Sequence, residues 1–235
     1  MALAKTIFIT GTDTGVGKTV LTGLLLHHLR EKGVRALAMK PFCSGSRRDV
    51  KLLKALQNSE LTDDEINPYY FKEAVAPLVA ARMHHKIILL KSVLEKIKGL
   101  QKRCDLLLIE GAGGLLAPLG EGFTNKDLIS KIDCAVLIVG RNRLGTINHT
   151  LLTVKALQAI RNQSVKAVLM EGKLTDDSAQ TNCEILRETL AEISVFRLPF
   201  IGASASSAIG VENCSKKMKK PLAQILKFDN LTTFF

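Results

Sequence analysis

The nine residues Gly11–Thr19 constrain the fold of this chain more than any other segment. They read GTDTGVGKT and lie between a β-branched and aromatic run, Ala4–Thr10, and an apolar run, Val20–Arg30, that Gly33 ends. The first run is typical of a buried strand and the second of a helix. A glycine-rich turn before a helix brings backbone N–H groups and the positive end of the helix dipole to one point. The segment therefore predicts an α/β fold with an anion-binding loop.

The side chains at the end of this loop suit a nucleoside triphosphate. Lys18 offers an ammonium group to phosphate oxygens, and Thr19 offers a hydroxyl to Mg²⁺. The loop is not a strict GxxxxGK[ST], because five residues separate Gly11 from Gly17. A structural glycine turn that merely precedes a lysine is the alternative reading. We expect phosphate binding, with these residues around the nucleotide: Asp13, Gly15, Val16, Gly17, Lys18, Thr19 and Val20.

Strands and helices alternate along the rest of the chain. Continuous apolar runs predict strands covered on both faces, and threefold to fourfold stripes predict helices. The pattern favours one domain over residues 1–235, with a doubly wound, mainly parallel sheet between two helical layers, as in P-loop NTPases. The expected strands are Val34–Met39, Asp105–Glu110, Cys134–Val139, Val165–Met170 and Val195–Leu198; the expected helices are Asp49–Leu56, Leu78–Met83, Leu90–Gln101, Gly145–Ile160 and Asp177–Ile193; Asn67–Pro77 is expected to be irregular.

Composition excludes several classes of protein. Hydrophobic residues make up 46% of the chain, yet the longest apolar runs are strand-length, so we expect no membrane span. No secretory leader precedes the first strand, and five cysteines without a CxxC pair favour reduced thiols, so we expect a cytoplasmic protein. The net charge of +11 is spread out and aromatic content is 5%, which argues against a nucleic-acid partner. The dense run Lys216–Lys220 is interpreted as an exposed helix end.

Other polar residues stand where strands are expected to end. In open α/β sheets ligands bind beyond the carboxyl ends of the strands. Glu110 ends a buried strand before Gly-Ala-Gly-Gly, Lys40 ends the second strand, and Asp49 begins a helix after the next loop. Glu110 and Asp49 are candidate carboxylate ligands for Mg²⁺, which takes one or two of them beside a nucleotide. For Asp49 an ordinary helix N-cap is the alternative, and for Lys40 a solvent-exposed position.

Four motifs together resemble dethiobiotin synthetase of the biotin pathway. They are GTDTGVGKT, Lys40-Pro41 with Ser44-Gly45, Glu110-Gly-Ala-Gly-Gly114, and Leu144–His149 (LGTINH), and the similarity runs in order from Thr6 to about Pro199. The resemblance implies a homodimeric ligase that converts 7,8-diaminononanoate, CO2 (or bicarbonate) and MgATP into dethiobiotin, ADP and phosphate. The amine would first become a carbamate, which the γ-phosphoryl group then activates for ring closure.

The same resemblance implies residue roles. Lys18, Lys40, Thr14 and Ser44 would be catalytic, and Thr19, Asp49 and Glu110 would hold the metal. Gly113, Gly114 and Glu171 would join the phosphate loop in binding ATP. Substrate would contact Ser44, Ala76 and Pro77, and its tail carboxylate would meet the turn of Gly145, Thr146, Ile147 and Asn148 across the dimer interface.

Two positions depart from that family's pattern. Gly15 stands where a glutamate is common, and Glu171 where an asparagine reads adenine; a carboxylate accepts from an amino group but lacks the amide donor. Two rival classes remain. An amidoligase of the cobyrinate-diamide type would need a glutamine amidotransferase region, which the sequence after Pro199 lacks. A partition or septum-positioning ATPase of the ParA or MinD kind has a similar core but usually a second lysine near Asp13.

Overall fold

A six-stranded parallel sheet forms the centre of the molecule. The computed structural model describes residues 3–158, 160 and 164–228. The strand order is β10-β9-β8-β1-β5-β2, and every pairing in this sheet is parallel. These strands span Lys5–Gly11 (β1), Ala36–Met39 (β2), Leu106–Glu110 (β5), Ala135–Arg141 (β8), Val165–Met170 (β9) and Val195–Leu198 (β10). The expected doubly wound α/β fold is confirmed.

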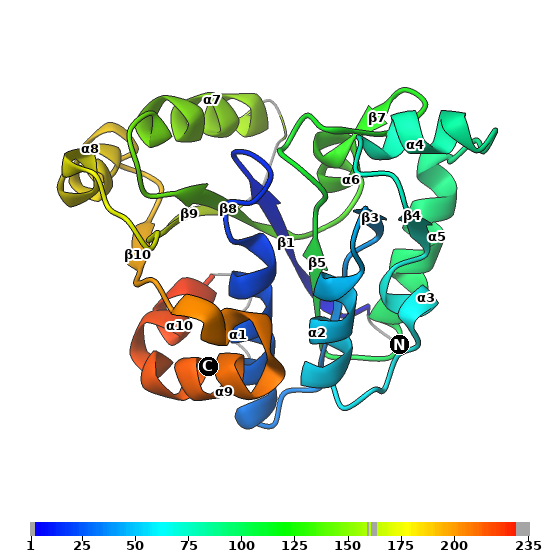
Figure 1. Ribbon diagram of the computed structural model, residues 1–235, viewed down its shortest axis with the longest axis horizontal. Coiled ribbons are helices and arrows are strands. Elements are labelled where there is room, and N and C mark those ends of the chain that lie inside the picture. Colours follow the sequence, from blue (N-terminus) through cyan, green and yellow to red (C-terminus); the bar gives the residue numbers. More distant parts are fainter. Residues whose placement is uncertain (1–2, 159, 161–163, 229–235) are drawn as a thin grey trace.

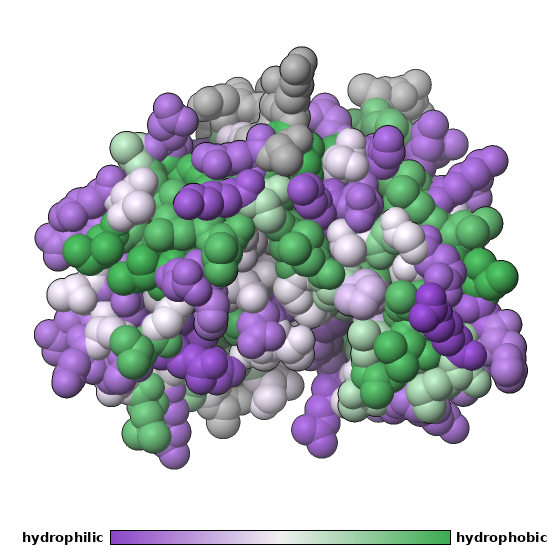
Figure 2. Space-filling view, turned by 90° about the horizontal axis from the view of Figure 1, so that it is seen from above, coloured by the Kyte–Doolittle hydropathy of each residue, from purple (hydrophilic) through white to green (hydrophobic). Residues whose placement is uncertain are grey.

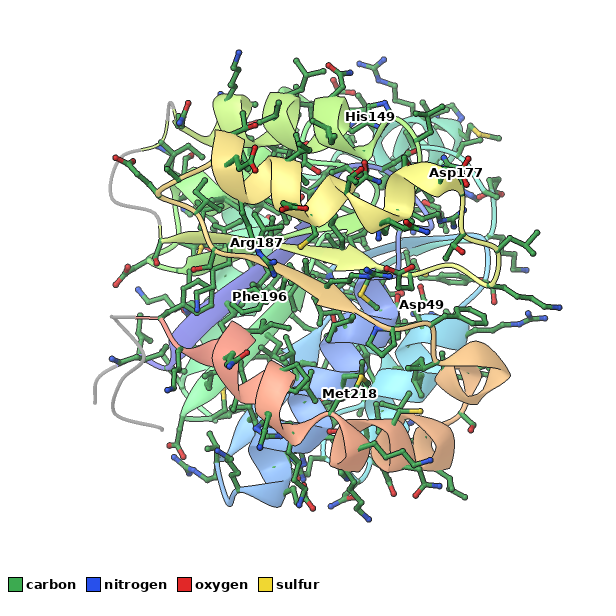
Figure 3. The ribbon with its side chains drawn as sticks, turned by 90° about the vertical axis from the view of Figure 1, so that its left-hand side faces the viewer. Asp49, His149, Asp177, Arg187, Phe196 and Met218 are labelled. Carbon is green, nitrogen blue, oxygen red and sulfur yellow. The ribbon has the colours of Figure 1, made fainter. Side chains whose placement is uncertain are left out.

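Helices cover both faces of the sheet. Helices α7 (Thr146–Gln158) and α8 (Asn182–Thr189) lie on one face, and α1 (Lys18–Glu31), α9 (Ala208–Lys217) and α10 (Lys219–Leu226) on the other (Figures 1 and 3). The central strands are therefore largely apolar: Leu106–Ile109 of β5 are fully buried. Burial on both faces is why their sequences run without polar alternation.

Shorter elements surround the sheet on the side of β2 and β5. Strands β3 (Phe42–Ser44) and β4 (Tyr69–Phe71) form a parallel pair, and β6 (Pro118–Gly120) with β7 (Phe123–Thr124) an antiparallel one. The other helices are α2 (Arg48–Leu56), α3 (Asp63–Ile66), α4 (Pro77–Met83), α5 (Leu90–Gln101) and α6 (Asn125–Ser130). Two 3₁₀ turns come later in the chain: η1 (Asp177–Gln180) before α8 and η2 (Gly202–Ser206) before α9.

The structure corrects four expectations from the sequence. Asn67–Pro77 is not wholly irregular, because Tyr69–Phe71 pairs with β3. The helix expected over Asp177–Ile193 is the turn η1 followed by the shorter α8. Helix α1 begins at Lys18, two residues before the expected start. The helix expected over Gly145–Ile160 is α7, described over Thr146–Gln158, and residue 159 of the expected range lies outside the described residues.

The carboxyl ends of the central strands meet at one edge. In the register of the sheet, Ile9 lies opposite Glu110, and Gly11 lies opposite Val139. The loop after β1 is thus adjacent to the ends of both β5 and β8.

In the part of the chain that the structure describes, no helix has the length and apolarity needed to cross a membrane. The five cysteines, all within the described ranges, form no disulfide.

Candidate active site

The loop between β1 and α1 has a backbone that requires glycine. Gly15 and Gly17 have φ values of +71° and +102°, in the left-handed region that side chains rarely adopt. A Cβ at Gly11 would lie 2.8 Å from the Asp13 carbonyl oxygen and 2.9 Å from Lys18 Nζ. Gly17 is the N-cap of α1, so the free N–H groups of the first helical turn face the loop. This geometry forms an anion cradle.

Lys18 is buried beside this loop. Its Nζ donates to the Asp13 carbonyl oxygen at 2.8 Å, and the side chain is folded back over the loop. Burial is the main cause that lowers the pKa of Lys18 to about 8. The negative charge of Glu110 raises this pKa, and the positive charge of Lys40 lowers it further. A buried ammonium group whose partner is a neutral carbonyl gains most from a nearby anion.

Four side chains form a connected polar cluster next to Lys18. Thr19 Oγ1 donates to Glu110 Oε1 at 2.7 Å, and Lys40 Nζ donates to the same oxygen at 2.8 Å. Lys40 also makes a short ion pair with Asp49. Burial opposes the charge of Lys40, but Glu110 and Asp49 outweigh it and hold the Lys40 pKa above its ordinary value. Lys40 is therefore a permanent cation at this site.

The geometry of the cluster fits a hydrated Mg²⁺ ion. Glu110 is fully buried and its Oε2 has no hydrogen-bond partner, which leaves a negative oxygen available for a ligand. Asp49 is partly exposed on the other side of Lys40. Among the residues described, no group of three or more His, Cys, Asp and Glu side chains is gathered for a metal. One hydroxyl and two carboxylates suit a Mg²⁺ that keeps water and phosphate ligands.

One cavity of about 970 Å³ brings most of the expected residues together. Its walls come from the phosphate loop, from the ends of β2 and β5, and from the loops before α4 and after β5. The expected residues that line it are Asp13, Thr14, Gly15, Gly17, Lys18, Thr19, Val20, Lys40, Ser44, Asp49, Ala76, Pro77, Glu110, Gly113 and Gly114. Ser44 Oγ is buried there without a partner, so its hydroxyl is available for a ligand.

A second cavity of about 640 Å³ lies on the other side of the phosphate loop. Glu171 and Val16 line it, together with Gly15, Gly17 and Val20, which both cavities share. Asn142 Nδ2 donates to Glu171 Oε1 at 2.7 Å, and Arg197 also pairs with that oxygen. Glu171 Oε2 is buried with no partner. The carboxylate is therefore held in place with one acceptor oxygen free.

The turn before α7 does not join the main cavity within one chain. Gly145 has a φ of +90°, and α7 begins at Thr146, as a free helix N-terminus requires. Gly145, Thr146, Ile147 and Asn148 do not line the 970 Å³ cavity, although Leu152 and Thr153 further along α7 do. Figure 3 shows His149, in the first turns of α7, at the upper edge of the molecule, far from Asp49 in that view.

Sequence reasoning missed two residues that hold the site loops. Arg141, at the end of β8, donates from Nη2 to the Gly15 carbonyl oxygen at 2.6 Å. Asn125 is fully buried and donates to the carbonyl oxygens of Ala112 and Gly114, each at 2.8 Å. No pattern marks either residue, because both act on main-chain carbonyls of other loops.

The parallel sheet, the glycine-dependent loop and the buried Lys18 define a P-loop nucleotide-binding protein. Comparison with known proteins agrees. A family described as an AAA domain matches residues 5–203. A ParA family ATPase from Chlorobium tepidum has a TM-score of 0.60 over 94% of this chain and 98% of its own, at 13% identity, which shows the fold alone.

Curated relatives identify the family. ATP-dependent dethiobiotin synthetase BioD of Bacillus licheniformis is 42% identical over 156 residues, 64% of this chain and 66% of that protein. Its counterpart from Bacillus velezensis is 33% identical over 236 residues, 97% of this chain and 98% of that protein. The chain belongs to the family of ATP-dependent dethiobiotin synthetases, as the four sequence motifs predicted.

Proposed function

We propose that this chain converts 7,8-diaminononanoate and CO2 into dethiobiotin in the cytoplasm, using ATP and Mg²⁺. The observation that carries the proposal is the 970 Å³ cavity in which Lys18, Lys40, Thr19 and Glu110 face one space beside the phosphate loop. Phosphoryl transfer needs mainly positioning and charge stabilisation, and this cluster supplies both. No covalent nucleophile is required.

The first steps make and activate a carbamate. One amine of the substrate attacks CO2, forms an N–C bond and loses a proton. The carbamate oxygen then attacks the γ-phosphorus, and ADP leaves with the electrons of the broken P–O bond. Lys18 and Lys40 would neutralise the charge on the transferred group, while the Thr14 and Ser44 hydroxyls donate to its oxygens. The free Ser44 hydroxyl supports this role.

The last step closes the ring. The second amine attacks the carbamate carbon, phosphate leaves, and a proton is lost. Ala76 and Pro77, which line the cavity before α4, would hold the diamine against the reacting group. A diamine fixed at that wall needs no general base beyond the departing phosphate.

The metal site we propose consists of Thr19, Asp49 and Glu110. These residues would hold Mg²⁺, which would supply positive charge to stabilise the transferred group. Glu110 contributes its unpaired, buried Oε2, and Thr19 its hydroxyl. Lys40 stays beside both carboxylates through its ion pairs with Asp49 and Glu110. In this way the second lysine and the metal would face the same triphosphate.

The second cavity would receive the nucleotide base. It adjoins the phosphate loop through Gly15, Gly17 and Val20, as a base linked to bound phosphates requires. The free Oε2 of Glu171 offers an acceptor to an exocyclic amino group. Glycines 113 and 114 would pack against the triphosphate from the opposite wall.

A second copy of the chain would complete the substrate site. The turn of Gly145–Asn148 lies outside the main cavity, so its N–H groups would reach a substrate carboxylate bound to the partner. The cavity rim is apolar and exposed: Leu116 and Leu152 have 60% and 58% of their surface accessible. Figure 2 shows hydrophobic side chains among the polar ones on the face seen from above. Exposed apolar rims favour association.

The test is product formation from defined substrates. Purified protein is incubated with diaminononanoate, bicarbonate and MgATP, and dethiobiotin is sought by mass spectrometry. We expect one ADP for each dethiobiotin formed and no hydrolysis without the diamine. ATP hydrolysis that does not depend on the diamine, together with a shift of duplex DNA in a gel, would instead favour a partition ATPase.

A further inference from the structure

Asn125 lies outside the main cavity but holds one of its walls. It is the first residue of α6, and its side chain is fully buried. Its Nδ2 donates to the carbonyl oxygens of Ala112 and Gly114, each at 2.8 Å. The backbone N–H of Lys126 donates to the Leu115 carbonyl oxygen at 3.1 Å. Two consecutive residues of α6 thus fix the loop after Glu110 at three points.

This loop is packed closely against the phosphate loop. A Cβ at Gly114 would lie 3.4 Å from the carbonyl oxygens of both Gly11 and Thr12. A Cβ at Gly113 would lie 3.7 Å from Thr14 Oγ1. Glycines at these positions allow the two loops to approach without side chains between them. A small shift of the loop after Glu110 would therefore change the cavity at its phosphate end.

The bonds from Asn125 also fix where two peptide N–H groups point. In a trans peptide the C=O and the N–H of the same unit point in opposite directions. Holding the Ala112 and Gly114 carbonyls toward Asn125 turns the N–H groups of Gly113 and Leu115 away from it. Both residues line the cavity, whereas Asn125 does not. Neither N–H donates to any group within the described ranges.

We propose that Asn125 is a positioning residue that aims the Gly113 and Leu115 N–H groups at oxygens of the transferred phosphoryl group or the carbamate. The inference rests on the proposed function for the chemistry of the ligand. Two fixed, neutral donors stabilise developing negative charge without reorganising during the reaction. Because Asn125 acts through the loop, its loss would affect the transition state more than the bound nucleotide.

The test compares Asn125→Ala with the wild-type protein in three measurements. We expect kcat to fall about 10- to 100-fold. The affinity for MgADP with aluminium fluoride, a mimic of the transferring phosphoryl group, is expected to fall by a similar factor. The affinity for MgADP alone should stay within about threefold, because the phosphate loop and Lys18 are untouched. Asn125→Asp, which cannot donate, should show the same pattern. Asn125→Ser replaces Asn125→Ala if the latter does not fold.

Gln57→Glu is the matched control. Gln57 is also a fully buried amide bonded to main chain: its Nε2 donates to the Ala38 carbonyl oxygen at 3.1 Å, and its Oε1 accepts from the Ala38 N–H at 3.0 Å. This variant should lose comparable stability in denaturant and keep its kcat and aluminium fluoride affinity.

Two outcomes separate the inference from the proposed function. Wild-type kcat and wild-type aluminium fluoride affinity in a folded Asn125 variant would overturn the inference and leave the proposed function intact. A wild-type protein that makes no dethiobiotin would contradict the proposed function. In that case, weaker aluminium fluoride binding by the Asn125 variants would still support the inference.

Discussion

Lys18 is charged in a place where burial works against the charge. Its pKa is lowered to about 8, so the folded chain binds its proton less tightly than the unfolded chain does. Between that pKa and the ordinary value of 10.5 the unfolded state holds more protons, and stability therefore rises with pH across this window. Below pH 8 Lys18 stays charged, which lowers the stability of the fold but suits the proposed phosphate ligand.

Lys18→Met should therefore gain stability while it loses activity. We expect a gain of about 1–3 kcal/mol at pH 7, shrinking as pH rises from 8 to 10.5, because the wild type loses its buried charge there. Turnover should fall to background. Urea unfolding at several pH values measures the gain. A variant less stable than wild type at pH 7 would mean that the Lys18 bond to Asp13 outweighs the cost of burial.

Glu171 gives a prediction about the base of the nucleotide. Its free Oε2 can accept from the 6-amino group of adenine but repels the 6-oxo group of hypoxanthine. We expect kcat/KM for ITP to be about tenfold or more below that for ATP. In Glu171→Gln, whose amide can also donate, the ratio should shrink. Equal kcat/KM values for ATP and ITP in the wild type would remove Glu171 from base recognition.

Residues of the phosphate end were predictable from sequence because they lie at or beyond the carboxyl ends of strands. Glu110 ends β5, Lys40 follows β2, and Lys18 comes after the loop that follows β1. Parallel strands bring such positions to one edge whatever their separation along the chain. Asn125 and Arg141 were not predictable, because their partners are main-chain carbonyls of other loops, which leave no mark on the sequence.

At the scale of elements, the C-terminal helices are the part that the sequence reading left undescribed. The run Lys216–Lys220 ends α9 and begins α10, as an exposed helix end should, but Met218 within it is buried. Neither helix shows a continuous apolar run, and both are held by tertiary packing against α1, with α10 also packed against β10. Strands β3 and β4 were not predicted from the sequence for a similar reason, since three-residue strands have no period to detect.

One buried cation links the end of α10 to the sheet. Lys166 of β9 donates from Nζ to the carbonyl oxygens of Gln224 and Ile225 at 3.1 and 3.2 Å, at the C-terminal end of α10. The ammonium group also lies 4.4 Å from the centre of the Phe228 ring. The Gln224 carbonyl oxygen also accepts from the Lys227 backbone N–H at 3.3 Å, and the cation adds a second donor at the end of α10 that complements the helix dipole.

Lys166→Met should loosen this end of the molecule. We expect a loss of about 2–4 kcal/mol, because several buried carbonyls lose their donor while the stem of the side chain keeps its packing. Denaturant unfolding measures the loss, and proteolysis should cleave within α10 earlier than in wild type. Lys217→Met, at an exposed position, is the control. Equal stability of the two variants would show that the cap contributes little.

At the scale of the whole molecule, the separation of the α7 turn from the main cavity is the most informative feature. A single chain provides the phosphate loop and the polar cluster of Thr19, Lys40, Asp49 and Glu110 in one cavity, but leaves Gly145–Asn148 outside it. If a partner supplies that turn, each active site uses the phosphate loop of one chain and the α7 turn of the other. Two inactive variants with defects at different places can then complement each other.

Lys18→Ala and Gly145→Val provide the pair for this test. Lys18→Ala removes the phosphate-binding cation, and Gly145→Val places a branched side chain at a φ of +90°, which strains the α7 turn. Each variant alone should be nearly inactive. After mixing and exchange of subunits, half of the dimers are mixed and each has one intact site, so activity should recover to roughly a quarter of wild type. A mixture no more active than its components, despite exchange shown by mass spectrometry, would mean that each chain builds its site alone.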